Sequence, residues 1–335
     1  MSGPLLEMSD VWLRLPEVAR RPVLAGVDLQ VGAGEIVGLV GESGSGKSVT
    51  ARAALGLLPP TAEVEGRVTV DGVDVLSAPA ADVRRLRAES VAMVFQDPRA
   101  GINPMRRIGD HLTESARLTG RRRDLDAARA RALELLDAVG LPDPRRHLRQ
   151  YPHELSGGML QRVMIAGALM GSPRLLLCDE PTTALDVTTQ AEIVALLGRL
   201  QRERGMGMLF ITHDLDLAAS VCDRIHVMYA GRVVEQAPAL GLFEQPRHPY
   251  TAGLLASTPA IDGGGTRLRA IPGVPLSLLE DPSGCVFAAR CDRVLDEVCR
   301  VLAPPVVADG VRSVRCARPL EARTPRHALR TECVS

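Results

Sequence analysis

Short apolar runs divide the first hundred residues of the chain and predict buried strands. Residues 35–41 form one such run and residues 91–95 form another. Residues 68–70 and 73–75 alternate apolar and polar side chains on either side of Asp-Gly at 71–72, a dipeptide that favours a tight hairpin turn. The first part of the chain is therefore expected to be rich in strands.

The apolar spacing becomes helical over residues 98–170. Residues 126–139 place apolar side chains three and four positions apart, and Gly140 stands where a helix would end. This stretch separates two groups of predicted strands, so we expect it to form a helical subdomain.

Strands are predicted again at residues 174–179 and 208–213, with a helix at about 187–204 between them. Alternation of strand and helix is typical of an α/β fold with a parallel sheet. We therefore assign residues 1–245 to one α/β domain that carries the helical subdomain.

The segment from residue 246 to 335 has a different composition. It is rich in proline, glycine and cysteine, and its apolar residues show little periodicity. We expect a small C-terminal domain here, with Gly263–Gly265 as a flexible hinge.

The clearest chemical motif follows the strand predicted at 35–41. Of the 40 lysines and arginines, only Lys47 is a lysine, and it lies in GESGSGKS, which matches G-x-x-x-x-G-K-[ST]. Glycines in such a loop let backbone N–H groups point at phosphates, and the lysine is a compact charge that reaches the β- and γ-phosphates. The hydroxyl of Ser48 is a ligand for Mg²⁺. The residues expected to bind the nucleotide are Gly41, Glu42, Ser43, Gly44, Ser45, Gly46, Lys47, Ser48 and Val49.

Two carboxylates end the strand predicted at 174–179. Asp179 at a strand end beside a phosphate-binding loop is placed to hold Mg²⁺. Glu180 comes one residue later, so it points elsewhere and can face the γ-phosphate, where a carboxylate can act as general base for an attacking water.

A second candidate anion site lies at Ser156, Gly157 and Gly158. The serine is a good N-cap, and the glycines expose N–H groups at the start of a helix. The residue types alone fit an ordinary capped helix equally well.

These motifs together resemble the ATP-binding cassette (ABC) ATPases. LSGGMLQR at 155–162 resembles their signature motif, in which arginine is commonest where Leu160 stands, and residues 184–186 resemble the D-loop. The resemblance implies a P-loop NTPase fold and these roles: catalysis by Glu180, His213 and Gln96; Mg²⁺ binding by Ser48, Gln96 and Asp179; contact with the partner's ATP by Ser156, Gly157, Gly158 and Gln161; and a D-loop aspartate at Asp186.

One feature of the family is missing from the first strand. The family usually stacks adenine on an aromatic side chain there, but Leu15 occupies that position. Trp12 is close by, although its different spacing favours a place in the core.

The resemblance narrows to the oligopeptide, dipeptide and nickel importer ATPases. It covers GESGSGKSVTARAALGLLP, VFQDPRAGINPMRRIGDHLTE and YPHELSGGMLQR, and extends to HPYT at 248–251, IPGVP at 271–275 and GCVFAARC at 284–291. It implies an ATPase of a peptide importer, with nickel as an alternative substrate. The implied partners are a homologous second ATPase subunit, two membrane permease subunits and an extracytoplasmic solute-binding protein. The alternative class is a non-transport ABC ATPase that clamps nucleic acid or a ribosome.

Composition weighs against a nucleic-acid partner, because the formal net charge is zero and only eight residues are aromatic. No apolar run approaches the length of about 18 residues that suggests a membrane span. The first ten residues have no basic stretch of the kind that begins a signal peptide. We expect a peripheral protein on the cytoplasmic face of the membrane.

Five of the seven cysteines fall in the C-terminal segment, and one of them, Cys333, is close to its end. The other four have the spacing C-x5-C-x7-C-x16-C: Cys285, Cys291, Cys299 and Cys316. Four thiolates can hold a [4Fe–4S] cluster or zinc, although zinc sites usually contain C-x2-4-C pairs, and free thiols remain open. Some importers that this chain resembles carry such a cluster, so the resemblance favours it. Its expected role is to fold the tail and not to assist catalysis.

Overall fold

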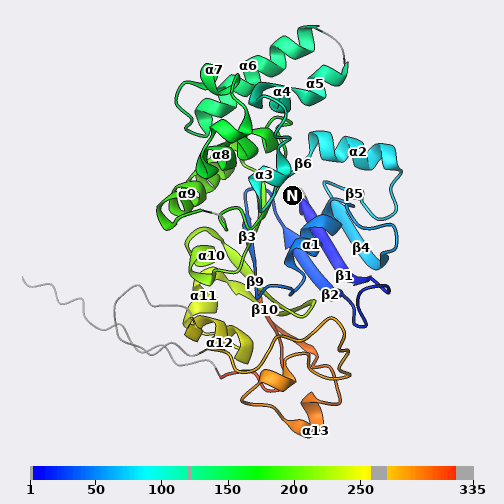
Figure 1. Ribbon diagram of the computed structural model, residues 1–335. Helices are drawn as coiled ribbons and strands as arrows, with labels where there is room; N and C mark the ends of the chain where they lie inside the picture. The colour runs from blue at the N-terminus through cyan, green and yellow to red at the C-terminus, as the bar shows by residue number, and fades with distance from the viewer. Residues whose placement is uncertain (1–2, 120–121, 184, 258–269, 322–335) are drawn as a thin grey trace, which may run out of the picture.

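A computed structural model describes residues 3–119, 122–183, 185–257 and 270–321 of the chain. Gly263–Gly265, Ala184 of the D-loop and Cys333 lie outside these residues. Within them the chain forms two sheets, a helical subdomain at one end and a C-terminal segment at the other (Figure 1).

The larger sheet has eight strands. Five are parallel (β9, β3, β8, β7 and β6), and the other three are added antiparallel at one edge. In spatial order they are β11 (Val306–Asp309), β12 (Arg312–Arg315), β10 (Arg232–Pro238), β9 (Arg224–Tyr229), β3 (Ile36–Val40), β8 (Gly207–Thr212), β7 (Leu175–Asp179) and β6 (Val91–Val94).

Strands β3, β7 and β8 are buried along their whole length, because each divides its side chains between two cores. In β7, Leu176 and Cys178 face one core while Leu175 and Leu177 face the other. Burial on both faces explains why these strands are continuous apolar runs in the sequence.

The smaller sheet covers one of these cores. Its four antiparallel strands, in spatial order, are β2 (Leu24–Val31), β1 (Leu6–Arg14), β4 (Glu63–Val70) and β5 (Val73–Asp74). The predicted hairpin at Asp71-Gly72 is confirmed as the β4–β5 connection, where both residues have positive φ, 47° and 82°. Helix α1 (Lys47–Ala54) packs between the sheets through its buried alanines.

Helices cover the other core and form the predicted subdomain. Gly140 ends α6 in the left-handed conformation predicted for a C-cap, with φ 75°. The helices between the phosphate loop and β9 are α2 (Ala80–Glu89), α3 (Pro98–Gly101), α4 (Ile108–Leu112), α5 (Glu114–Thr119), α6 (Arg122–Ala138), α7 (Pro144–His147), η1 (Pro152–Glu154), α8 (Gly157–Ala168), α9 (Val187–Arg204) and α10 (Leu215–Val221). No helix in the described part of the chain is both long enough and apolar enough to cross a bilayer.

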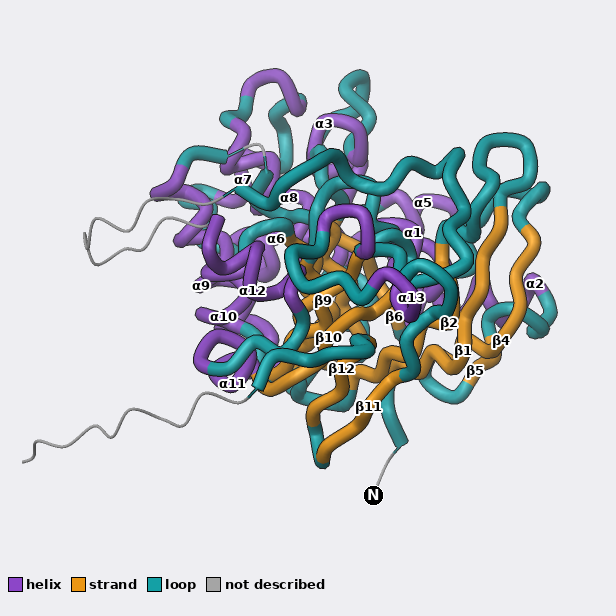
Figure 2. Tube along the Cα trace, turned by 90° about the horizontal axis from the view of Figure 1, so that it is seen from below, coloured by secondary structure: helices purple, strands orange, loops and turns teal. Residues whose placement is uncertain are grey.

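The C-terminal segment extends the main sheet. Its hairpin β11–β12 pairs with β10, matching Glu235 to Val314 and Gln236 to Ser313, and lies along the sheet edge in Figure 2. The remaining elements after β10 are α11 (Ala239–Glu244), α12 (Pro249–Ser257), η2 (Ala288–Arg290) and α13 (Asp296–Cys299). The weak apolar periodicity of the tail gave no indication of this pairing.

Buried Glu235 helps to fix the tail against β10. Its two carboxylate oxygens accept hydrogen bonds from the N–H groups of Arg247 and His248, both at 2.8 Å. The division expected at residues 245 and 246 falls between α11 and α12, and the main sheet continues across it.

Candidate active site

The loop at 41–48 connects β3 to α1, as the sequence predicts. Gly41 is required by close approach, because a Cβ there would lie 2.1 Å from the carbonyl oxygen of Met228. Gly44 and Gly46 have φ values of 76° and 110°, which L side chains rarely adopt. The buried hydroxyl of Ser45 has no hydrogen-bond partner among the described residues.

Lys47 lies inside this loop with only 4% of its surface exposed. Its Nζ donates to the carbonyl oxygens of Gly41 at 2.7 Å and Glu42 at 3.1 Å. Burial lowers the pKa of the ammonium, and the nearby carboxylate of Glu180, 3.7 Å away, opposes that shift. The loop thus holds one preorganised positive charge beneath a turn of backbone N–H groups, which suits a phosphate chain.

Ser48 and Asp179 meet beside this lysine. The hydroxyl of Ser48 donates to Oδ1 of Asp179 at 2.8 Å, although the two residues are far apart in the sequence. Burial raises the pKa of Asp179. A hydroxyl and a carboxylate are oxygen ligands of the kind Mg²⁺ prefers, so this pair fits that ion.

The other predicted catalytic residues lie around the carboxylate of Glu180. Its Oε2 accepts hydrogen bonds from Gln96 Nε2 at 3.3 Å and Thr183 Oγ1 at 2.8 Å, and it lies 3.3 Å from His213 Nδ1. The residue has φ 46°, unusual for a glutamate. The structure therefore brings Gln96, Glu180 and His213 to one edge of the sheet. Thr183 was not predicted, since nothing in the sequence distinguishes it from an ordinary loop threonine.

The signature residues lie at the start of α8. Ser156 caps this helix, accepting a hydrogen bond from the N–H of Met159 at 3.3 Å. A Cβ on Gly158 would lie 2.8 Å from Thr189 Cγ2, so the helix start packs tightly against α9. The structure shows no hydrogen bond or ion pair between the described residues of this motif and those of the phosphate loop. The two anion-binding features therefore share no polar contact within the described part of the chain.

Two residues of the signature motif, Leu160 and Gln161, are buried. Leu160, where related sequences most often have arginine, is 2% exposed in the core and takes no charge there. Gln161 is 1% exposed, and its Nε2 has no partner among the described residues. Its predicted contact with a partner's nucleotide stays a prediction.

Asp186 caps α9 and does not contact the site described above. It accepts hydrogen bonds from Thr189 N at 3.0 Å and Thr189 Oγ1 at 2.7 Å, and these lower its pKa. It is the one D-loop residue predicted to contribute a functional group, and its side chain is exposed.

Trp12 is not the core residue that its spacing favoured. It is half-buried, its Nε1 donates to Asp10 Oδ1 at 2.8 Å, and the guanidinium of Arg232 lies 5.4 Å from its ring centroid. The neighbouring Val11 and Leu13 fill the core instead, because alternate residues of a strand face opposite sides. Leu15 is only partly buried.

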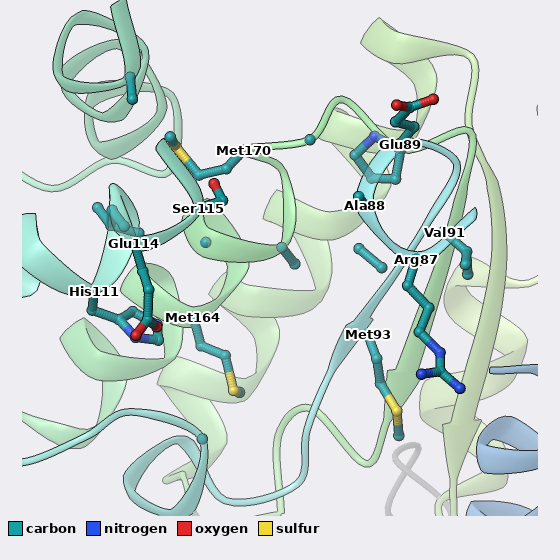
Figure 3. A pocket seen from close by; sticks show the side chains of 18 of the residues that line it. Arg87, Ala88, Glu89, Val91, Met93, His111, Glu114, Ser115, Met164 and Met170 are labelled. Carbon is teal, nitrogen blue, oxygen red and sulfur yellow. The ribbon is translucent and has the colours of Figure 1, made fainter. Parts of the chain in front are cut away.

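A large cavity of about 860 Å³ lies between β6 and the helical subdomain (Figure 3). Its lining includes the side chains of Met93, Met164 and Met170 and charged side chains such as Arg87 and Glu114. Phe95, which immediately precedes Gln96, also lines it and is 41% exposed. The labelled lining residues are Arg87, Ala88, Glu89, Val91, Met93, His111, Glu114, Ser115, Met164 and Met170.

The four tail cysteines come together around a cavity of about 20 Å³. Burial raises the pKa of Cys285 to about 11, and it also raises those of Cys291 and Cys316. No three His, Cys, Asp or Glu side chains within the described ranges are arranged to hold a metal ion. The donor types fit a cluster, but the expected iron–sulfur site is not confirmed.

Comparison with known proteins accounts for most of the chain. Residues 24–183 match the ABC transporter family, and residues 234–299 match the oligopeptide/dipeptide transporter, C-terminal region. The oligopeptide transport ATP-binding protein OppD of Salmonella typhimurium is 46% identical over 292 residues, which cover 86% of each chain. A putative peptide import ATP-binding protein of Brucella melitensis is 47% identical, covering 87% of this chain and 90% of its own.

Solved structures give the same class of fold. The cbiO1 protein of Clostridium perfringens, part of the ABC transporter complex cbiONQ, matches with a TM-score of 0.63 and 28% identity over 72% of this chain and 91% of its own. The ATP-binding cassette MJ0796, a dimer in a post-hydrolysis state with ADP and Pi, matches with a TM-score of 0.61 and 29% identity over 70% of this chain and 98% of its own.

The fold and the site define an ATP-binding cassette ATPase with Mg²⁺ as its metal ion. Within that class, the chain belongs to the ABC transporter family, in the branch whose members carry the oligopeptide/dipeptide transporter C-terminal region.

Proposed function

We propose that this protein is an ATP-hydrolysing subunit that energises a peptide importer. The observation that carries the chemistry is the convergence of Lys47, Asp179, Glu180 and His213 at one edge of the parallel sheet. The importer assignment rests on the similarity to oligopeptide transport ATP-binding proteins over most of both chains.

Each charged group at this edge has a separate role in hydrolysis. Lys47 binds the β- and γ-phosphates, and Mg²⁺ held by Ser48, Asp179 and Gln96 would neutralise charge on them. Glu180 takes a proton from the water that attacks the γ-phosphorus, the bond from phosphorus to the bridging oxygen breaks, and ADP leaves. His213 lies against the same carboxylate and holds its orientation.

The separation of the two anion-binding features supports a partnership. Ser156, Gly157 and Gly158 begin a helix, and among the described residues no hydrogen bond or ion pair joins them to the phosphate loop. In a head-to-tail pair with a homologous ATPase subunit, each chain's signature helix would complete the other's site. A signature motif that makes no polar contact with the phosphate loop of its own chain is thus a reason to expect a second cassette.

We assign the 860 Å³ cavity to a cytoplasmic helix of a membrane permease subunit. Phe95 and Gln96 are neighbours, so a helix in the cavity touches the segment that reaches Glu180. Two permease subunits and an extracytoplasmic solute-binding protein complete the proposed complex. This places the chain at the cytoplasmic face of the membrane, held there by its partners.

The docking proposal has a direct test. Phe95→Asp should abolish co-purification with the permease subunits while ATP still binds. Met105→Asp is the matched control, because Met105 is 83% exposed and lies outside the cavity. Equal co-purification of both variants would contradict the assignment.

We further propose that Cys285, Cys291, Cys299 and Cys316 ligate a [4Fe–4S] cluster. Their convergence around one cavity supports this proposal. Anaerobic purification should give a brown protein with a broad absorbance near 400 nm and about four irons per chain. Bound zinc or four free thiols in a colourless, iron-free protein would refute it.

Transport itself is tested with the assembled complex. The chain is co-expressed with candidate permease, ATPase and receptor subunits, and ATP hydrolysis is measured in lipid with oligopeptide, dipeptide or Ni²⁺. Stimulation by a peptide-loaded receptor supports the proposal. Stimulation by Ni²⁺ alone would reassign the substrate, and failure to associate with any permease would favour a non-transport cassette.

A further inference from the structure

The C-terminal segment is hydrogen-bonded to the phosphate-binding loop at Glu42. Arg290 forms two hydrogen bonds with this carboxylate, from Nη1 to Oε2 at 2.6 Å and from Nη2 to Oε1 at 3.0 Å. The hydroxyl oxygen of Tyr250 accepts a hydrogen bond from the backbone N–H of the same glutamate at 2.9 Å. No motif in the sequence indicated a contact between the tail and the phosphate-binding loop.

Arg290 is held firmly in place by the tail. It is 7% exposed, and its Nε donates to the carbonyl oxygen of Pro272 at 2.9 Å. Its guanidinium lies 5.7 Å from the ring centroid of Tyr229 and 6.0 Å from that of Phe287. A bidentate arginine–carboxylate pair is among the stronger polar contacts in proteins and fixes orientation as well as distance.

The aromatic rings behind this pair form one cluster. The ring centroids of Tyr229 and Tyr250 are 4.7 Å apart, and Phe287 lies 5.2 Å from the first and 5.3 Å from the second. Tyr229 comes from β9 and the other two from the C-terminal segment. We call the contacts of Arg290 and Tyr250 with Glu42 the brace. Side chains of both the ATPase core and the tail therefore support it.

The tail also runs alongside the loop further on. Pro275, Leu276 and Leu278 of the tail and the loop residues 42–45 line one cavity of about 100 Å³. Arg21, 3% exposed, lines the same cavity, and its Nε donates a hydrogen bond to the carbonyl oxygen of Ser277 at 3.1 Å. The contact at Glu42 is thus part of a continuous interface.

A short chain of contacts leads from this brace to the lysine of the site. The carbonyl oxygen of Glu42 accepts hydrogen bonds from Lys47 Nζ at 3.1 Å and from Ser45 N at 3.2 Å. Any shift of Glu42 therefore moves an acceptor of Lys47. Cys291 directly follows Arg290, so the cysteine segment lies one residue from the brace.

We propose that Arg290 and Tyr250 are positioning residues of the ATP site, which hold Glu42 so that the phosphate loop keeps its nucleotide-binding shape. The C-terminal segment is then part of the ATPase and not an appendage to it. This inference rests on ATP binding by the chain and does not depend on which solute is transported. Its test can therefore fail while the importer assignment holds, and the importer assignment can fail while this inference holds.

The test is equilibrium binding of MgATP to the full chain. Arg290→Ala should weaken binding about tenfold, or about 1.4 kcal/mol, and Arg290→Lys should weaken it less, because lysine keeps the charge but loses the two-pronged geometry. If Arg290 acts through Glu42, the double variant with Glu42→Ala should bind no more weakly than the worse single variant. Arg300→Ala is the control, since Arg300 pairs with exposed Asp296 within the tail. Arg290→Ala binding within twofold of the wild type would overturn the proposal.

A second measurement covers the case in which Arg290→Ala fails to fold. Tyr250→Phe removes only the acceptor oxygen and leaves the ring cluster intact, so binding should weaken with little change in Tm. By linkage, MgATP should also slow amide hydrogen exchange at residues 271–291 in the wild type. Unchanged exchange there, with Tyr250→Phe binding normally, would show that the contact is structural only.

Discussion

Nδ1 of His213 lies 3.3 Å from Oε2 of Glu180, the same carboxylate oxygen that accepts hydrogen bonds from Gln96 and Thr183. Three elements of the chain thus converge on one oxygen atom, while the other oxygen, Oε1, lies 3.7 Å from Lys47 Nζ. A carboxylate held at both oxygens has a fixed orientation, which a general base needs.

Glu180→Gln should therefore bind MgATP normally but hydrolyse it about 10²–10⁴ times more slowly, roughly 3–5 kcal/mol of barrier. The amide keeps the size of the side chain but cannot take up a proton. The ATPase rate of the assembled complex, with MgATP affinity measured in parallel, checks this. Turnover near the wild-type rate would show that another group is the base.

Ser48→Ala should remove most of the gain in nucleotide affinity that Mg²⁺ provides, because the hydroxyl paired with Asp179 at 2.8 Å is a ligand that we predict for that ion. We expect a loss of at least about tenfold, or about 1.4 kcal/mol, in the presence of Mg²⁺ and a much smaller change in EDTA. The measurement is ATP titration under both conditions. Ser220→Ala, whose hydroxyl bonds only the backbone of its own helix at Leu217, is the control. Equal losses with and without Mg²⁺ would contradict the metal role.

Local features of the fold were predictable because local physics determines them. The Gly-rich loop needs glycines where φ is positive or the backbone is crowded, and the Asp71-Gly72 turn follows from the same rule. The fully buried strands could be recognised as unbroken apolar runs. The structure brings the residues that these features carry to one edge of the sheet, and the roles predicted for them stay predictions.

Contacts between distant segments were not predictable in this way. Arg290 and Glu42 are 248 residues apart, and nothing in either neighbourhood signals the other. The pairing of β12 with β10 depends on Glu235 and on the path of the tail, and the short strand β11 is exposed along its length. Apolar periodicity predicts which face of a segment is buried, but not which segment covers it.

Gly41→Ala should destabilise the protein by about 3 kcal/mol, the upper end of overpacking effects, because its Cβ would lie 2.1 Å from the carbonyl oxygen of Met228. Gly44→Ala is the matched comparison: nothing lies within 4 Å of its Cβ, so only the backbone strain at φ 76° remains, about 1–2 kcal/mol. Urea unfolding of the full chain measures both. A larger loss for Gly44→Ala would show that conformational strain, and not close approach, sets the glycine requirement.

The last prediction concerns His226, a buried residue of β9 outside the ATP site. Burial, assisted by the charge of Arg224, lowers the pKa of its imidazole to about 3, and neither ring nitrogen has a partner of sound hydrogen-bond geometry among the described residues. The folded state therefore keeps this ring neutral down to about pH 3, whereas the unfolded chain protonates it near the ordinary value of about 6.5.

Between these two pH values the unfolded state binds more protons, so His226 makes the wild type less stable as the pH falls, with a slope of up to about 1.4 kcal/mol per pH unit. His226→Leu removes this effect, and its stability relative to the wild type should rise by about 2 kcal/mol between pH 7.5 and pH 5.0. Urea unfolding of both proteins at the two pH values measures the difference, in which contributions from all other groups cancel. His153→Leu, at an exposed position, should show no such change. A stability difference for His226→Leu that is the same at both pH values would mean that the ring is protonated equally in the folded and unfolded states, which would contradict the prediction.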